Sequence, residues 1–77
     1  MTIEILSPEK QIFQGEADSI QLPGTNGSFG ILENHAPIIS TLQSGDVRIV
    51  KDGNEQLFLI KGGVVEVQKN KVIVLSD

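Results

Sequence analysis

The 77-residue sequence has no cysteine, no tryptophan and no tyrosine, and its one histidine is His35. Without cysteine there is neither a disulfide nor a thiolate nucleophile. A single histidine excludes the ordinary zinc sites, which need several histidine or cysteine ligands. No apolar run exceeds four residues, whereas a membrane-spanning helix needs about 20, and no signal peptide is visible. We therefore expect one cytosolic domain over residues 1–77, without a metal centre.

Basic residues are few and scattered along the sequence. Six Lys and Arg against ten Asp and Glu give a net charge of −4. A nucleic-acid-binding protein clusters its basic residues to neutralise phosphates. The three phenylalanines lie far apart and are too few for a base-stacking platform. Nucleic acid is therefore not an expected partner.

The residues present in excess are the β-branched aliphatic ones. Ile and Val together number 17, against seven Leu and two Ala. β-Branched side chains lose rotamer freedom in helices but pack well on a pleated sheet. Short alternating segments are separated by turn residues, and no stretch of ten residues has helical periodicity. The sequence predicts an all-β domain, an antiparallel sandwich or flattened barrel of eight or more short strands.

Particular residues predict where the strands turn. Asp52-Gly53 predicts a two-residue hairpin, because both positions favour positive φ, and Lys69-Asn70 predicts a second one. Pro23-Gly24 predicts another turn, and Gly15 a bulge or bend. Residues 38–42 fit either a strand or a single helical turn.

Two predicted strands are apolar on both faces. In residues 72–75 all four side chains are apolar, so each face of this last strand needs cover. In the strand over residues 55–61, Leu57 and Leu59 share one face, and Phe58 and Ile60 share the other.

Catalytic candidates are weak. A Ser-His-Asp triad would need His35 as its base, oriented by one of the aspartates Asp18, Asp46, Asp52 and Asp77. A single histidine always permits such a triad on paper, and a loop histidine more often makes a structural hydrogen bond or lies at an interface. The glutamates Glu4, Glu9, Glu16 and Glu66 alternate outward, as on an ordinary solvated face. We therefore expect no catalytic residue.

The glycine-rich residues 24–30 invite comparison with a phosphate-binding loop. No Lys-Ser/Thr pair follows them, and no helix begins there to offer its amino-terminal N–H groups. We interpret these glycines as turn residues and expect no bound nucleotide or other cofactor. Phe29, a large apolar ring in this segment, either plugs the end of the barrel or contacts a partner; we favour the plug.

A longer motif covers residues 23–37, with the pattern Pro-Gly-x-x-Gly-x-Phe-Gly-Ile-Leu-x-Asn-His-Ala-Pro. It closely resembles the epsilon subunit of F-type ATP synthase, called delta in mitochondria. Residues 5–16, 44–49, 62–67 and 70–75 agree with the same family, so the resemblance spans essentially the whole chain. It implies a β-sandwich of about ten strands that is clamped to the gamma subunit of the rotor and stands on the membrane-embedded c-ring.

The function implied by this resemblance is non-catalytic. The protein would be a central-stalk subunit that couples ion flow to ATP synthesis through rotation, held peripherally at the cytoplasmic face of the inner (plasma) membrane. Residues that would contact gamma are Ser7, His35, Ala36, Pro37 and Ser40, and residues that would contact the c-ring are Asn26, Gly27, Ser28 and Phe29.

The sequence departs from the family pattern in two respects. Glu33 stands where members commonly have proline. Unlike proline, glutamate has a backbone N–H donor and a free φ, so the following loop is expected to be less rigid or differently bonded. Most bacterial members continue into two carboxy-terminal helices that inhibit ATP hydrolysis or bind ATP. Here the sequence ends at Asp77, so we expect no such helical domain.

Two other functional classes remain open from the residues alone. A free-standing sandwich that binds a peptide or sugar would need a groove with several aromatic side chains. A small hydrolase using His35 would need a positioned nucleophile. Co-purification with a gamma subunit would separate the rotor subunit from both.

Overall fold

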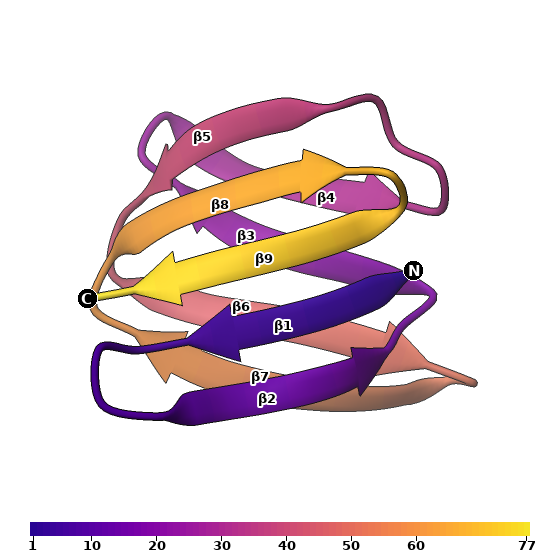
Figure 1. Ribbon diagram of the computed structural model, residues 1–77, viewed down its shortest axis with the longest axis horizontal. Helices are drawn as coiled ribbons and strands as arrows, with labels where there is room; N and C mark the ends of the chain where they lie inside the picture. Colours follow the sequence, from indigo (N-terminus) through magenta and orange to yellow (C-terminus); the bar gives the residue numbers. More distant parts are fainter.

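The computed structural model describes all 77 residues, which form nine strands and no helix (Figure 1). The strands are β1 (Thr2–Leu6), β2 (Gln11–Glu16), β3 (Ser19–Gly24), β4 (Gly27–Leu32), β5 (Ile38–Leu42), β6 (Gly45–Lys51), β7 (Asn54–Ile60), β8 (Gly63–Gln68) and β9 (Lys71–Ser76). The predicted all-β class is confirmed, with nine strands rather than about ten. Residues 38–42 form a strand rather than a helical turn. The structure contains no membrane-spanning helix.

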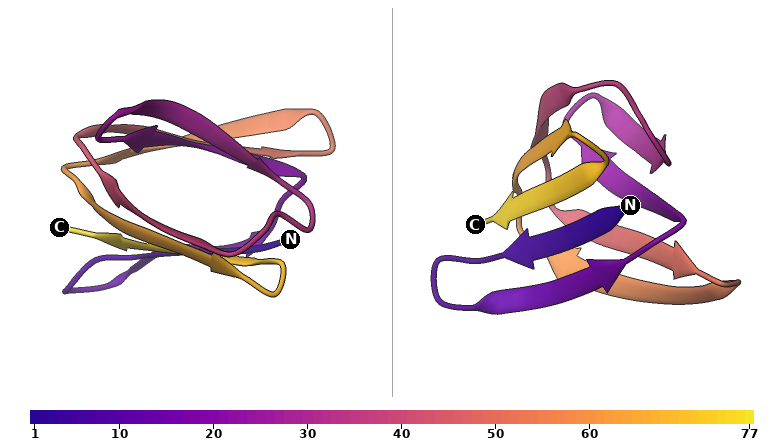
Figure 2. Two further views of the ribbon diagram at one scale, coloured as in Figure 1. Left: turned by 90° about the horizontal axis from the view of Figure 1, so that it is seen from above. Right: turned by 45° about the vertical axis from the view of Figure 1, so that its right-hand side comes forward.

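The strands are arranged as a flattened barrel of two layers. Their order is β2-β1-β9-β8-β5-β3-β6-β7, and β4 pairs with β3. The front layer holds β2, β1, β9, β8 and β5, and the back layer holds β4, β3, β6 and β7 (Figures 1 and 2). The layers join where β5 meets β3 at one pair, Gly24 and Leu42. This arrangement confirms the predicted sandwich or flattened barrel.

One strand pairing in the front layer is parallel. The first and last strands, β1 and β9, run side by side in the same direction over five residue pairs, from Thr2–Lys71 to Leu6–Leu75. All the other pairings are antiparallel. A parallel pair needs a long connection between its strands, and here seven intervening strands provide it.

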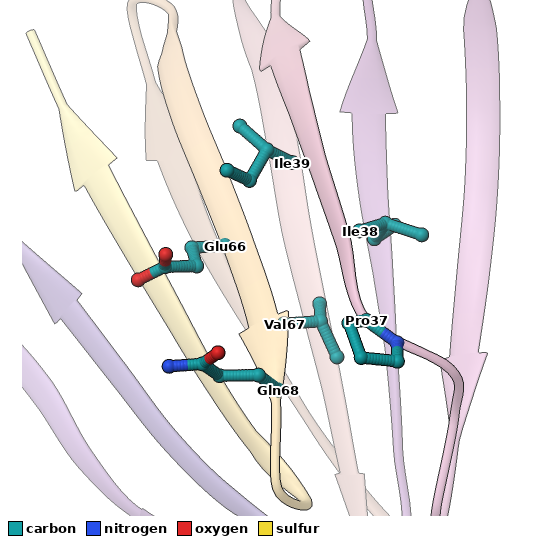
Figure 3. Close-up of a pocket in the computed structure, with 6 residues that line it drawn as sticks. All are labelled: Pro37, Ile38, Ile39, Glu66, Val67 and Gln68. Carbon is teal, nitrogen blue, oxygen red and sulfur yellow. The ribbon is translucent and has the colours of Figure 1, made fainter.

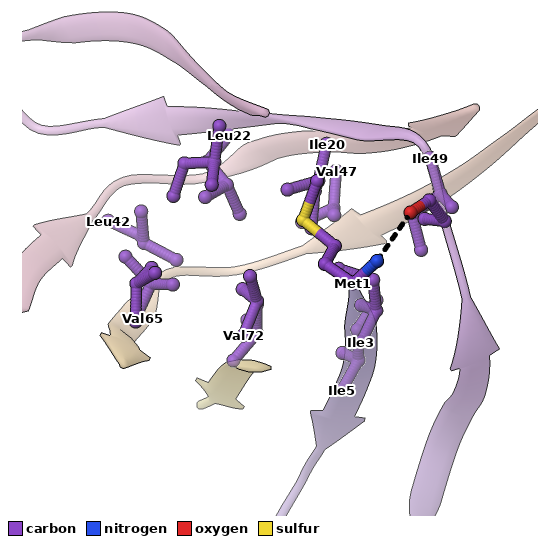
Figure 4. Packing of buried hydrophobic residues seen from close by; sticks show 14 of the residues in the cluster. Met1, Ile3, Ile5, Ile20, Leu22, Leu42, Val47, Ile49, Val65 and Val72 are labelled. Atoms are coloured by element: carbon purple, nitrogen blue, oxygen red, sulfur yellow. Dashed lines mark hydrogen bonds between the residues drawn. The ribbon is translucent and has the colours of Figure 1, made fainter. Parts of the chain in front are cut away.

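Side chains that alternate inward from the two layers form a single core (Figure 4). The front layer contributes Ile3, Ile5, Val65, Val67, Val72 and Val74, and the back layer contributes Ile20, Leu22, Ile31, Val47, Ile49 and Ile60, each at most 2% exposed. Met1, Ala17 and Leu42 complete the buried cluster. Each fully buried aliphatic side chain stabilises the fold by about 1.5–3 kcal/mol relative to an exposed one.

The prediction of a turn at Pro23-Gly24 is wrong, because both residues belong to β3 and the turn is Thr25-Asn26. The carbonyl oxygen of Pro23 accepts a hydrogen bond from the N–H of Gln43 at 2.8 Å, which holds the strand extended. Gly24 is required by close packing: a Cβ there would lie 2.7 Å from the Phe29 ring.

The bulge predicted at Gly15 is also misplaced. Gly15 pairs regularly with Ile3, and the register shifts instead at the end of β1, where Ile12 is the extra residue of β2. The missing side chain of Gly15 makes room for Phe13, whose ring would lie 3.1 Å from a Cβ.

The two predicted hairpin turns are confirmed. Asp52 and Gly53 have φ values of 51° and 78°, and Lys69 and Asn70 have values of 52° and 58°. Positive φ at both central positions is the geometry that matches the twist of the flanking strands.

Candidate interaction surface

The outer face of the front layer carries a group of apolar side chains that its own chain leaves uncovered. This outer patch consists of Ile39 on β5, Val64 on β8, and Ile73 and Leu75 on β9. Ile39 is 73% exposed, Leu75 51% and Val64 37%. The strand register brings them together, because Ile39, Glu66 and Ile73 lie opposite one another across β5, β8 and β9. An exposed apolar group of this kind marks a surface that a partner can cover.

The patch borders a shallow pocket of about 300 Å³. It is lined by Pro37, Ile38, Ile39, Glu66, Val67 and Gln68. In the close-up, Ile39, Glu66 and Gln68 extend to one side of the two strands, while Val67 points to the other (Figure 3). No aromatic side chain lines the pocket, so it offers no stacking platform for a sugar or an aromatic ligand.

Two of the four patch residues, Ile73 and Leu75, belong to the last strand, whose unbroken apolar run at residues 72–75 was the sequence signal for them. Val72 and Val74 are fully buried, whereas Ile73 and Leu75 point outward, so the chain itself covers only one of the two apolar faces of this strand. Ile39 was not predicted, because residues 38–42 fit either a strand or a turn and the outward side of the segment could not be assigned.

The residues expected at the gamma subunit lie around this surface but do not form one cluster. Ser7 follows β1 at one end of the front layer, and His35, Ala36 and Pro37 precede β5 at the other end (Figure 1). Pro37 lines the pocket, and Ala36 is exposed. Ser40 pairs with the buried Val65 and lies on the inward side of β5, half-buried.

Glu33 fixes the loop that carries His35. Its carboxylate accepts hydrogen bonds from the Met1 amino group and from Asn70 Nδ2, the latter at 2.8 Å. Asn70 Oδ1 in turn accepts from the N–H of Asn34, also at 2.8 Å. The hydrogen bond from the amino terminus and then that from Asn70 lower the pKa of Glu33 below its usual value. The side chain of Glu33 thus ties the loop to Met1 and to the β8–β9 turn, through bonds that a proline side chain cannot make.

The amino group of Met1 has two further partners. It donates to the carbonyl oxygen of Ala17 at 3.0 Å and lies 3.7 Å from the Glu16 carboxylate. Burying a charged group is costly unless it is paired and hydrogen-bonded, and this ammonium has both kinds of partner.

No catalytic arrangement forms around His35. Its Nδ1 donates to the carbonyl oxygen of the adjacent Ala36 at 2.6 Å, and no aspartate is a hydrogen-bond partner of the ring. Asp18 instead accepts from the N–H of Asp52 at 2.8 Å and lies 3.7 Å from Lys51. No group of His, Asp and Glu is placed to hold a metal ion.

The residues expected at the c-ring divide into two sets. Asn26, Gly27 and Ser28 are exposed at the β3–β4 hairpin, and Ser28 Oγ accepts a hydrogen bond from Gln21 Nε2 at 3.1 Å. Phe29 points the other way, half-buried and packed against the core. Phe29 therefore packs against the core from β4, and its role at the c-ring stays a prediction.

Comparisons with known proteins agree on one family. The model of the "ATP synthase, Delta/Epsilon chain, beta-sandwich domain" matches residues 1–77. The chain is 40% identical over 77 residues to the ATP synthase epsilon chain of Leptospira interrogans, covering 61% of that protein. It is 45% identical over 76 residues to the epsilon chain of Delftia acidovorans, covering 97% of this chain and 55% of that protein.

Solved structures share the fold at lower identity. A chain of the Euglena gracilis mitochondrial ATP synthase superimposes with a TM-score of 0.89 at 19% identity, over 96% of this chain and 48% of that one. A chain of the Tetrahymena thermophila mitochondrial ATP synthase central stalk and c-ring gives 0.79 at 20%, over 97% and 61%. The 77 residues span between 55% and 61% of the length of these curated relatives. The chain belongs to the family of β-sandwich domains of ATP synthase delta/epsilon chains.

Proposed function

We propose that this β-sandwich is a non-catalytic part of the central stalk of an F-type ATP synthase, where it links the gamma subunit to the c-ring. In this role it transmits rotation between ion flow and ATP synthesis, and it is held at the cytoplasmic face of the inner (plasma) membrane through the complex. Membership of the family supports the proposal. The observation that carries it is the outer patch, which brings together three of the six exposed large apolar side chains of the domain, Ile39, Val64 and Leu75.

The gamma subunit is the partner that we assign to the outer patch. The patch lies between the two ends of the front layer where Ser7 and the loop His35–Pro37 are found. A partner lying along the layer would contact Ser7, Ala36 and Pro37 at its margins and Ile39 and Leu75 near its centre. Interfaces typically have this arrangement, with an apolar centre and a polar rim.

The c-ring is the partner that we assign to the β3–β4 hairpin. Its tip residues Asn26, Gly27 and Ser28 are small, polar and exposed, which lets a partner approach the backbone closely. Contacts to several identical loops are individually weak, and tethering through gamma raises the effective concentration to about the millimolar range. In this arrangement Phe29 packs against the core and supports the hairpin, and the exposed part of its ring is what the c-ring would contact.

No nucleotide site is part of this proposal. Residues 24–30 form a strand end, a turn and an edge strand rather than a loop before a helix, so no helix amino terminus can hold a phosphate. Inhibition and ATP sensing are accordingly not functions that we assign to these 77 residues. A peptide- or sugar-binding role gains no support, because the pocket beside Ile39 has no aromatic lining.

Co-purification with a gamma subunit tests the proposal. We expect the chain to form a complex with co-expressed gamma, and Ile39→Glu to weaken binding at least about tenfold, since it places a charge in an apolar interface centre. Leu32→Glu is the matched control: Leu32 is 67% exposed against 73% for Ile39 but lies on β4 in the back layer. A wild-type chain that fails to bind gamma, or two variants that weaken binding equally, would contradict the assignment.

A further inference from the structure

The sheet has three strands with a neighbour on one side only: β2, β4 and β7. Exposed strand edges invite pairing with other chains, and proteins usually protect them with bulges, prolines or short length. The bulge at Ile12 interrupts β2, and β4 contains two glycines among its six residues. The strand β7 has seven residues, contains neither glycine nor proline, and pairs with β6 without a register shift. It is the least protected of the three edges.

The register of the β6–β7 hairpin shows which backbone groups face this open edge. The two-residue turn closes on Lys51 and Asn54, a pair that exchanges hydrogen bonds, and antiparallel pairs then alternate between bonded and non-bonded. The N–H and C=O groups of Glu55, Leu57 and Leu59 therefore point away from β6. Val50, the residue of β6 opposite Glu55, supports this assignment. Its carbonyl oxygen accepts a hydrogen bond from the N–H of Asp18 at 2.8 Å and therefore points away from β7.

The residues with free backbone groups also carry exposed apolar side chains. Leu57 is 56% exposed and Leu59 76%, on the outer face of the back layer. Glu55 precedes them on the same side of the strand, and the exposed Lys61 follows directly after it. The edge thus presents an acidic residue, two leucines and a basic residue at alternating positions.

This order is complementary to itself when two copies run antiparallel. In one register, Leu57 of each copy lies opposite Leu59 of the other, and Glu55 lies opposite Lys61, so symmetry forms each favourable pair twice. Two adjacent registers also match the free backbone groups; one puts Leu59 opposite Glu55 and the other puts Leu57 opposite Lys61, so both are less favourable. Glu55 already binds Arg48 within the chain, and Lys61 would join that pair.

We propose that this chain self-associates through β7 into a symmetric dimer in which the two back layers form one continuous sheet. Its partner is a second copy, because the alternation of charge and leucine along β7 matches its own reverse. One strand edge buries less than the roughly 1,200 Å² of a standard stable interface, so the dimer is weak and depends on protein concentration. The inference does not rest on the proposed place in the rotor, since β7 lies on the layer opposite the outer patch.

Sedimentation velocity of the 77-residue chain from about 10 μM to about 1 mM measures this equilibrium. We expect a dimer at the high end and a dissociation constant raised at least about tenfold by Leu59→Lys, which removes apolar contact and adds charge repulsion between copies. Leu57→Pro should have a similar effect, because it removes an N–H that β6 does not use. Ile39→Lys, at a site 73% exposed on the other layer, is the control and should dimerise as wild type.

Amide hydrogen exchange gives a direct readout at the same concentrations. The N–H groups of Leu57 and Leu59 should exchange more slowly as the protein is concentrated, and that protection should be absent in folded Leu59→Lys. A chain that stays monomeric at every concentration overturns the proposal. So does a dimer that Ile39→Lys disrupts and Leu59→Lys does not, and so does protection of these amides only when another subunit is added, which would assign the edge to that subunit.

Discussion

Gly63, the first residue of β8, is the position where a single added methyl group should be most costly. Its φ is 146°, a conformation that side chains rarely adopt, and a Cβ would lie 2.0 Å from the carbonyl oxygen of Leu75. That oxygen belongs to the backbone of β9, where Gly63 pairs with Ser76. Relieving the overlap therefore requires the β8–β9 pairing to shift.

The magnitude of the Gly63→Ala effect follows from these two contributions. Backbone strain of this type costs about 1–3 kcal/mol, and the steric overlap adds to it, so we expect a loss of about 3–5 kcal/mol in the free energy of unfolding. At roughly 0.05–0.15 kcal/mol per residue, a domain of this size has a total of about 4–12 kcal/mol. The substitution should thus consume a large share of the stability, and the Tm should fall by more than about 10 °C.

Gly27→Ala provides the matched comparison. Gly27 also has a positive φ, 126°, but nothing lies within 4 Å of the Cβ position, so this variant should show strain of about 1–3 kcal/mol without the overlap. Urea unfolding followed by far-ultraviolet circular dichroism measures both, since the chain has no Trp or Tyr for fluorescence. If the two variants lose equal free energy at an unchanged m-value, the argument from close approach to Leu75 is refuted.

Four further outcomes are expected. Hydrogen bonds lower the pKa of Glu33, so the stabilisation from this carboxylate is present above its unfolded pKa and is lost as pH falls through the folded value. As the pH is lowered from about 5.5 to about 2.5, the free energy of unfolding should therefore decrease more steeply for wild type than for Glu33→Gln. Parallel curves for the two proteins would contradict this. Ala36→Glu should weaken binding to gamma by up to about tenfold, less than Ile39→Glu does, because Ala36 lies at the margin of the assigned interface, while circular dichroism shows the isolated domain still folded; normal binding would mean that the face is misassigned. Gly27→Trp should loosen coupling between ion flow and ATP synthesis in membrane vesicles, whereas ATP hydrolysis by the detached catalytic head should persist. A fully coupled variant would contradict the assignment of the β3–β4 hairpin to the c-ring. Titration calorimetry with ATP at about millimolar concentration should give no saturable heat, as expected for a chain without a phosphate-binding loop; a clear isotherm would establish a site in the sandwich.

The features that the sequence predicted correctly depend on neighbouring residues. Asp52-Gly53 determines its own turn through backbone preferences, and the alternation in residues 57–60 puts the two leucines on one face of the strand by its period, without showing which face is outward. The motif at residues 23–37 identified the family, and the family implied the complete β-sandwich that these local signals alone did not specify. In the last strand the same period showed that both faces are apolar, but not that Ile73 and Leu75 form the outward one.

The features that the sequence did not predict depend on residues far apart. The parallel pairing of β1 with β9 joins the two ends of the chain, and no local pattern specifies it. Glu33 finds Asn70 at a separation of 37 residues, so sequence reasoning could foresee altered bonding but not the partner. Pro23-Gly24 has an ordinary turn signal that tertiary packing overrides. Gly24 packs against the Phe29 ring, and the carbonyl oxygen of Pro23 accepts a hydrogen bond from the N–H of Gln43.

The parallel pairing of β1 and β9 also determines how the domain responds to force. Both strands run in the same direction, with the amino terminus at one end of the front layer and the carboxyl terminus at the other (Figure 1). A pull that separates the two termini along this axis therefore slides β1 past β9 in shear, and all five residue pairs resist it together. A hairpin pulled open from its ends would instead lose its pairs one after another. Stretching this chain by its termini in a single-molecule experiment should accordingly give one abrupt rupture rather than gradual extension.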